Sequence, residues 1–303
     1  MALFARARGP QFDAHTSLGE LRGFYTALFS RFGAPDPDVA FKPAKLGLIN
    51  GEWVHPANAV PERLILYFHG GGFIAGSPET HRTIIAKLAK EAEASALSVA
   101  YRLAPECPFP SAVRDGVDVY RHLIARDVSP GSIVLAGDGA GGGLAFATCV
   151  GIRNGGLPMP AGIVAMSPWA DLSLSGWSMM ENSGRDAFLG WDALFLSARQ
   201  YLKRMNPNDP YASPAFANFK DFPPIMVHAG QREILRDDAS RIGDRAAESN
   251  VPVSIEIYDG MQHLFQADPM LREAGLSLGR LGNFIRARTK VQQIPQLRSM
   301  AGE

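Results

Sequence analysis

Residues 132–147 read SIVLAGDGAGGGLAFA, and this stretch decides the fold. Residues 132–136 form an apolar run of strand length, and the small residues 142–147 are predicted to form a helix. Glycines between them permit a sharp change of chain direction that side chains would obstruct. A buried strand that turns directly into a helix is the repeating unit of an α/β protein.

The same alternation continues along most of the chain. Strands are predicted at residues 46–54, 64–68, 97–101, 133–136, 163–166, 225–229 and 253–258. Helices are predicted at residues 83–94, 112–125, 142–153, 239–249 and 271–285. Strands that alternate with helices indicate an α/β fold with a mostly parallel central sheet covered on both faces by helices.

Two aromatic-rich segments interrupt this alternation. Residues 1–45 contain a helix-like stretch that ends at a Gly-Ala-Pro-Asp-Pro string, and residues 170–220 form a long insertion between two predicted strands. We interpret both as parts of a helical cap over the strand ends. The predicted organisation is therefore an N-terminal part of the cap at residues 1–45 and a core at residues 46–303, which carries the cap insertion at about residues 170–205.

Composition excludes several classes of protein. The 303 residues include 30 basic and 30 acidic side chains, so no net charge attracts nucleic acid or an anionic membrane. No apolar run is long enough to span a bilayer. Arginines interrupt the first residues, which lack the apolar core of a secretory signal. Two cysteines, Cys107 and Cys149, make no disulfide framework, so we expect a reduced, cytoplasmic protein.

The glycine-rich turn has the spacing of a nucleophile elbow. In a G-x-S-x-G elbow, a strained turn between strand and helix presents a serine hydroxyl. Gly139 stands at the serine position, between Gly137 and Gly141. Glycine adopts a positive φ without strain but supplies no oxygen, so this position decides between an enzyme, a disabled enzyme and a binding protein.

A second glycine-rich string, His69-Gly70-Gly71-Gly72-Phe73, follows the predicted strand at residues 64–68. Backbone N–H groups left free in such a loop can bind an oxyanion. No Lys-Ser/Thr pair follows the string, and no G-x-G-x-x-G with a downstream acidic residue occurs, so nucleotide binding is not indicated. An HGGG loop upstream of an elbow is typical of lipases and esterases.

Further strings match one family in order, at residues 69–73, 101–106, 137–142, 209–214, 233–238 and 263–265. The sequence resembles the hormone-sensitive-lipase-like family of α/β hydrolases, the bacterial carboxylesterases with an HGGG loop and a GDSAGG elbow. The resemblance covers roughly residues 60–290. It implies an α/β-hydrolase fold with eight strands, a cap built from the N-terminus and a mid-chain insertion, and a small-molecule ester as substrate. It also allows a homodimer.

Chain order assigns the other catalytic roles. In this fold the nucleophile precedes the acid and the acid precedes the histidine. His263 follows the last predicted strand and is the predicted base, whereas His228 lies within a strand and is interpreted as a core residue. Glu233 stands where the family usually has aspartate and is the predicted acid, with Asp237 and Asp238 as open alternatives.

The remaining site residues are expected to bind an oxyanion or to hold the loops. The backbone N–H groups of Gly71, Gly72 and Ala140 are the predicted oxyanion hole. His69 is expected to support the HGGG loop. Asp138 precedes the apex of the turn, so we expect its side chain to point away from the pocket and brace the loops.

Two hypotheses about function remain. The first is a carboxylesterase for small apolar or aromatic esters, with a Ser-His-Glu triad whose nucleophile is replaced by Gly139, naturally or by design. Such a chain would bind substrate without turning it over. The alternative is a non-catalytic receptor or pseudoenzyme on the same fold. No H-E-x-x-H string or metal-spaced cluster occurs, so we expect no metal and no cofactor.

Overall fold

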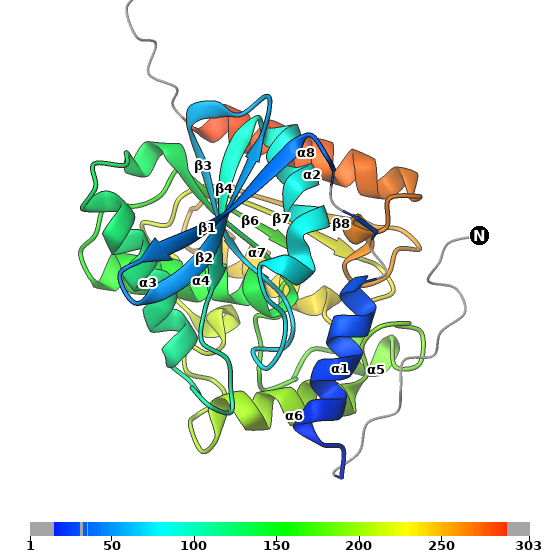
Figure 1. Ribbon diagram of the computed structural model, residues 1–303. Helices are drawn as coiled ribbons and strands as arrows, with labels where there is room; N and C mark the ends of the chain where they lie inside the picture. The colour runs from blue at the N-terminus through cyan, green and yellow to red at the C-terminus, as the bar shows by residue number, and fades with distance from the viewer. Residues whose placement is uncertain (1–14, 31–32, 35, 290–303) are drawn as a thin grey trace, which may run out of the picture.

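The central feature of the computed structural model, which describes residues 15–30, 33–34 and 36–289, is a sheet of eight strands (Figure 1). The strand order is β1-β2-β4-β3-β5-β6-β7-β8. Pairing is antiparallel between β1 and β2 and between β2 and β4, and parallel across the rest of the sheet. The strands are β1 (Val39–Leu46), β2 (Ile49–Pro56), β3 (Val60–Phe68), β4 (Ala94–Ala100), β5 (Ile133–Asp138), β6 (Gly162–Met166), β7 (Ile225–Gly230) and β8 (Val253–Tyr258).

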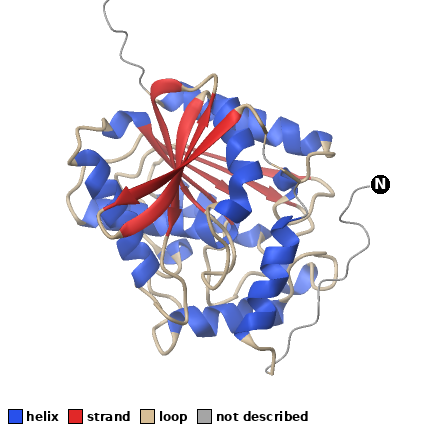
Figure 2. Cartoon of the chain, in the orientation of Figure 1, coloured by secondary structure: helices blue, strands red, loops and turns tan. Residues whose placement is uncertain are grey.

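Helices cover the sheet on both sides (Figure 2). The longer helices are α1 (Leu18–Phe29), α2 (Arg82–Ala92), α3 (Ser111–Ile124), α4 (Gly139–Asn154), α6 (Trp191–Leu202), α7 (Arg236–Glu248) and α8 (Arg272–Arg288). Helix α2 packs against α8, and α3 packs against α4. Every residue of β5 and β6 is buried, because parallel strands between two helical layers have no solvent-facing side. The predicted mostly parallel α/β-hydrolase sheet is therefore confirmed.

The first strands differ from the sequence prediction, which placed one strand at residues 46–54. The structure instead has a hairpin, in which Leu46 pairs with Ile49 across a two-residue turn at Gly47 and Leu48. Gly47 has a φ of +65°, which suits a tight hairpin turn. The sequence did not predict β1, because it is an edge strand in which exposed and buried side chains do not alternate regularly and which contains an internal proline, Pro43, that an edge strand tolerates.

Another difference lies between α2 and β4. The predicted helix runs to residue 94, but Glu93 adopts a left-handed conformation that ends α2, and β4 begins at once at Ala94. The small residues that follow suit the buried centre of the sheet better than a helix surface, so tertiary packing overrides the helical propensity of alanine.

Segments expected to form the cap meet at one end of the molecule (Figure 1). Helix α1 begins with a capping box, in which the Ser17 hydroxyl accepts from the Glu20 N–H and the Glu20 carboxylate accepts from the Ser17 N–H. It contacts α6, where the Tyr25 side chain hydrogen-bonds Ser197. Helix α6 and the short helix α5 (Ser178–Glu181) come from the connection between β6 and β7. The boundary at residue 45 differs from the structure, since residues 39–45 belong to β1, and residues 1–14 lie outside the described part of the chain.

Candidate active site

The predicted nucleophile position lies at the junction of β5 and α4. Gly139 is the first residue of α4 and has a φ of +50°. A Cβ atom added to Gly139 would have His263 Nε2 as its nearest neighbour, at 3.5 Å, which is ordinary van der Waals contact. A Cβ at Gly137 or Gly141, by contrast, would overlap neighbouring backbone atoms. The flanking glycines are therefore required by close packing, whereas position 139 has room for a side chain.

Two residues predicted to cooperate with this position lie side by side. His263 follows β8, and Glu233 follows β7, so the parallel pairing of these strands brings their carboxyl ends together. His263 Nδ1 lies 3.0 Å from Glu233 Oε2, and the glutamate side chain is fully buried. The imidazole thus turns its Nε2 atom toward Gly139.

The alternative carboxylates do not reach the histidine. Asp237 accepts a hydrogen bond from the Ser178 N–H at 2.8 Å, and Asp238 accepts from the Ala170 N–H at 2.7 Å. Both lie in the first turn of α7 and attach the connection after β6 to the core. Of the three carboxylates, the structure brings Glu233 to His263.

The surroundings of His263 favour its protonated form. Burial, the largest single effect, lowers the pKa of the imidazole. The hydrogen bond and charge of Glu233, together with the charges of Asp186 and Asp138, outweigh it, so the pKa is raised above its ordinary value. A histidine poised in this way accepts a proton readily from a neighbouring group.

Sequence reasoning missed Asp186, which lies in the connection between α5 and α6. Its Oδ1 atom accepts hydrogen bonds from the Phe188 and Leu189 N–H groups at 2.9 and 3.0 Å, and its Oδ2 atom accepts from the Ile234 N–H at 2.9 Å. One buried carboxylate therefore joins two pocket-lining residues to the residue after Glu233. No sequence signal identified it, because a lone aspartate in a loop is ordinary.

Ser167 was also missed, and it connects the loops that carry Glu233 and His263. It follows β6 with a φ of +48° and accepts a hydrogen bond from the Leu264 N–H at 3.1 Å. Its side chain also hydrogen-bonds Glu233, which stabilises the charged carboxylate. The serine hydroxyl thus holds the residue after His263 and the carboxylate that faces the imidazole in one arrangement.

The HGGG loop turns sharply at the edge of the pocket. Gly71 and Gly72 have φ values of +117° and +63°, a region that favours glycine. Within the described part of the chain, neither N–H group donates a hydrogen bond. The Ala140 N–H lies in the first turn of α4, where helical N–H groups have no intrahelical partner. All three residues line one pocket with Gly139 and His263.

A buried polar network holds this loop against the end of β5. Asp138 Oδ1 accepts from the Tyr67 hydroxyl at 2.7 Å and from the Gly70 N–H at 3.1 Å. His81, another residue missed at the sequence level, has its Nε2 atom 3.4 Å from Asp138 Oδ2. His69 Nδ1 donates to the Gly70 carbonyl at 2.8 Å, and burial lowers the pKa of His69 to about 3, so its ring is neutral.

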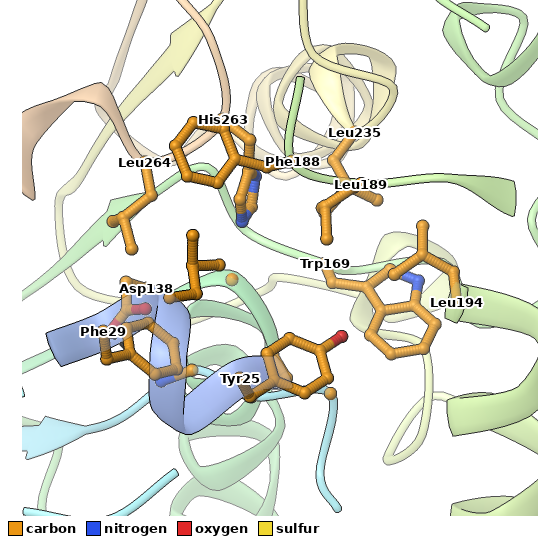
Figure 3. A pocket seen from close by; sticks show the side chains of 16 residues that line it. Tyr25, Phe29, Asp138, Trp169, Phe188, Leu189, Leu194, Leu235, His263 and Leu264 are labelled. Atoms are coloured by element: carbon orange, nitrogen blue, oxygen red, sulfur yellow. Dashed lines mark hydrogen bonds between the residues drawn. The ribbon is translucent and has the colours of Figure 1, made fainter. Parts of the chain in front are cut away.

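The pocket itself is walled by apolar side chains from the cap and the core (Figure 3). Tyr25 and Phe29 come from α1, and Phe188 and Leu189 come from the connection that Asp186 holds. His263 points into the space between these groups (Figure 3). The lining residues are Tyr25, Leu28, Phe29, Gly70, Gly71, Gly72, Asp138, Gly139, Ala140, Trp169, Phe188, Leu189, Leu194, Leu235, His263 and Leu264. The pocket suits a small, mostly apolar ligand.

Other side chains considered at the sequence level lie away from the pocket. His228 is buried in β7, and its Nδ1 atom is 2.7 Å from the Ser277 hydroxyl oxygen. Cys107 is half-buried and Cys149 is buried, and both are free. Among the residues the structure describes, no group of three or more His, Cys, Asp or Glu side chains is placed to hold a metal ion. Within the same residues, no helix combines the length and apolarity needed to cross a membrane.

The eight-stranded sheet, the strand–turn–helix at Gly139 and the loops that converge on it define an α/β hydrolase. A family described by the alpha/beta hydrolase fold matches residues 65–267. The chain is 35% identical to a solved esterase from the bacterial hormone-sensitive lipase family, which superposes with a TM-score of 0.88 and covers 92% of this chain and 94% of that one. The chain belongs to the hormone-sensitive-lipase-like α/β hydrolases.

The relatives of this chain include an acetyl-hydrolase and an esterase. An acetyl-hydrolase from Streptomyces hygroscopicus is 38% identical over 262 residues, which are 86% of each chain. An esterase from Acinetobacter venetianus is 36% identical over 232 residues, which are 76% of each chain. The solved structure of EstE5 soaked with p-nitrophenyl butyrate is 35% identical with a TM-score of 0.87, and the match covers 93% of this chain and 95% of that one.

Proposed function

We propose that the pocket binds small apolar or aromatic carboxylic esters and that this chain holds them without forming an acyl-enzyme. The observation that carries the proposal is the geometry at Gly139. The position has open space for a Cβ atom 3.5 Å from His263 Nε2, and glycine provides no nucleophilic oxygen there. A serine hydroxyl at this position would lie within hydrogen-bond reach of the imidazole, about 2.6–3.2 Å.

The other groups in the pocket fit ester hydrolysis by a Gly139→Ser form. His263 takes the proton of the serine hydroxyl as that oxygen attacks the ester carbonyl carbon, and Glu233 stabilises the imidazolium. The N–H groups of Gly71, Gly72 and Ala140 bind the oxyanion of the tetrahedral intermediate. The imidazolium protonates the departing alcohol, and His263 then activates a water molecule that hydrolyses the acyl-enzyme.

The proposed substrate class follows from the pocket walls and from the relatives. Aromatic and leucine side chains surround the reacting position, and the Tyr25 hydroxyl is a polar group near Gly72, 3.3 Å from where a Cβ atom on that glycine would lie. Such a lining favours a short acyl chain and an apolar alcohol over a charged ester. An acetyl-hydrolase relative and the structure of EstE5 soaked with a butyrate ester are consistent with this class.

The test compares Gly139→Ser with Gly139→Ala on phenyl acetate and p-nitrophenyl butyrate. Both substitutions place a Cβ atom in the same space at a positive φ, but the serine alone supplies an oxygen. Loss of a triad member costs about 10⁶-fold in kcat, so the serine form should exceed the alanine form by several orders of magnitude. A folded Gly139→Ser form that hydrolyses no more ester than Gly139→Ala would refute the proposal.

A second candidate is a non-catalytic receptor for a small apolar ligand. Gly139 itself favours it, because an apolar pocket without a nucleophile leaves a bound ligand intact. Both candidates predict binding by the chain as it stands. The two candidates make different predictions for the codon at position 139 and for the Gly139→Ser form. A glycine codon in the source gene, together with a Gly139→Ser form that binds esters but leaves them intact, would support the receptor.

A further inference from the structure

The turn at Gly139 leaves a small space directly beside the imidazole. A Cβ atom there would have three neighbours, His263 Nε2 at 3.5 Å, His263 Cε1 at 3.7 Å and the Gly70 Cα atom at 4.0 Å. The turn is fixed, because the Gly139 carbonyl accepts a hydrogen bond from the Trp169 N–H at 2.8 Å. The difference between glycine and serine is therefore a hydroxymethyl-sized space that faces a base.

We propose that, in the chain as it stands, a small neutral nucleophile such as hydroxylamine or methanol occupies this space and accepts the acyl group of a bound ester directly, without an acyl-enzyme. This activity rests on the proposed ester-binding function but uses no nucleophile of the protein. Glycine at position 139 leaves room for the small nucleophile, whereas alanine does not, because the alanine methyl group would fill the same space.

The size of the nucleophile follows from the contacts of the site. Hydroxylamine and methanol have the same number of non-hydrogen atoms as the missing hydroxymethyl group. Around the space lie the Gly70 backbone and the His263 ring, with Leu264 in the same pocket wall. A nucleophile with bulky substituents on nitrogen would collide with this wall or displace the ester.

The reaction balances without any oxidant or reductant. The nitrogen of hydroxylamine forms a bond to the ester carbonyl carbon, and His263 Nε2 takes the proton released from that nitrogen. The carbonyl oxygen carries the negative charge, which the N–H groups of Gly71, Gly72 and Ala140 bind. The ester C–O bond then breaks, and the departing alkoxide takes the proton from Nε2. The products are a hydroxamic acid and an alcohol, and His263 returns to its neutral form.

His263 is oriented to act as a general base even though no serine is present. Glu233 binds Nδ1 at 3.0 Å, which leaves Nε2 as the atom that accepts a proton. Charged groups that act on the imidazole come from three separate segments: Glu233 from the loop after β7, Asp186 from the cap and Asp138 from the end of β5. They stabilise the imidazolium that forms during attack, which is the effect a general base requires.

The experiment measures hydroxamate formation from phenyl acetate at about pH 8, above the ordinary histidine pKa of about 6.5. The chain as it stands is compared with Gly139→Ala, His263→Ala and His55→Ala, the last a histidine in β2 outside the pocket. General-base catalysis contributes about a hundredfold or more. We expect saturable, hydroxylamine-dependent hydroxamate formation about a hundredfold above both Gly139→Ala and His263→Ala, with His55→Ala equal to the parent.

Circular dichroism establishes that each variant is folded. Equal rates for the parent and folded Gly139→Ala would overturn the inference, as would full activity in folded His263→Ala. N-cyclohexylhydroxylamine keeps one N–H group, so it can still form a hydroxamic acid. Relative to the uncatalysed reactions with phenyl acetate, it should be accelerated far less than hydroxylamine, and equal accelerations of the two would contradict the size argument.

The result is separable from the proposed function. If Gly139→Ser hydrolyses phenyl acetate but the chain with Gly139 forms no hydroxamate from hydroxylamine, the further inference fails and the proposed function stands. If neither protein reacts, both fail.

Discussion

Replacement of Asp186 by asparagine tests whether the cap fixes the chemistry of the pocket. The aspartate accepts three backbone hydrogen bonds, two from the pocket-lining residues Phe188 and Leu189 and one from Ile234, which follows Glu233. Asparagine has nearly the same shape but a single acceptor oxygen and no charge. In the Asp186→Asn protein, one buried N–H group must face an amide nitrogen.

The expected cost to stability combines two opposed effects. Leaving the Ile234 N–H without a partner costs about 1–3 kcal/mol. Burial raises the pKa of Asp186, although the charge of His263 and the three N–H groups oppose that shift, so removal of the charge recovers part of the cost. We expect Asp186→Asn to lower the free energy of unfolding by about 1–2 kcal/mol.

The same change acts on His263. Because the charge of Asp186 contributes to raising the pKa of the imidazole, its removal lowers that pKa. In the Gly139→Ser background, kcat/KM rises with pH as His263 loses its proton, with an inflection above about 6.5. Asp186→Asn should move this inflection to lower pH, an effect that a purely structural role would not produce.

Urea unfolding and pH–rate profiles provide the two measurements, with Asp192→Asn as the matched control. Asp192 is an exposed carboxylate in the first turn of α6, so its neutralisation should leave the inflection unchanged and lower the free energy of unfolding only by its interaction with the helix dipole, about 0.3–1 kcal/mol. An Asp186→Asn protein with the stability and the inflection of its parent would refute the reasoning.

Two further predictions concern the acid and a buried histidine. In the Gly139→Ser background, Glu233→Gln should lower kcat by about 10⁴-fold, since the amide cannot stabilise the imidazolium, whereas Asp237→Asn should have little effect; comparable losses in the two variants would reopen the choice of acid. Burial lowers the pKa of His228 to about 4 in the folded protein, whereas the unfolded value is about 6.5. The unfolded state therefore binds the extra proton between these values, so stability is complete above about pH 6.5 and falls by up to about 3 kcal/mol as the pH drops to about 4. His228→Gln should flatten this slope in urea unfolding measured at successive pH values, and an unchanged slope would assign the acid sensitivity to other groups.

Local signals in the sequence predicted most of the fold. Apolar runs, glycine turns and helical segments alternate within windows of about 10–15 residues, so they are visible without tertiary information. The elbow at Gly139 and the HGGG loop are also local, because each is a short string that follows a strand. The prediction failed where the sheet meets solvent: β1 lies at the edge, alternates weakly and contains Pro43, so its sequence has little to distinguish it from a loop.

Contiguous residues encode most of the sheet, the position without a nucleophile and the candidate base His263, so these features could be predicted from the sequence. Only the tertiary structure decided among the carboxylates. Glu233 meets His263 because β7 and β8 are parallel neighbours, while the start of α7 directs Asp237 and Asp238 toward the connection after β6.

Tertiary contacts alone also revealed Asp186 and His81, which reach the site from segments far away in the chain. Tertiary contacts also distinguish Gly139 from its neighbours. Close packing against backbone atoms requires glycine at Gly137 and Gly141, whereas the space beside Gly139 opens toward the imidazole. A string of glycines cannot convey that difference, because the atoms that create it belong to strands and loops elsewhere in the fold.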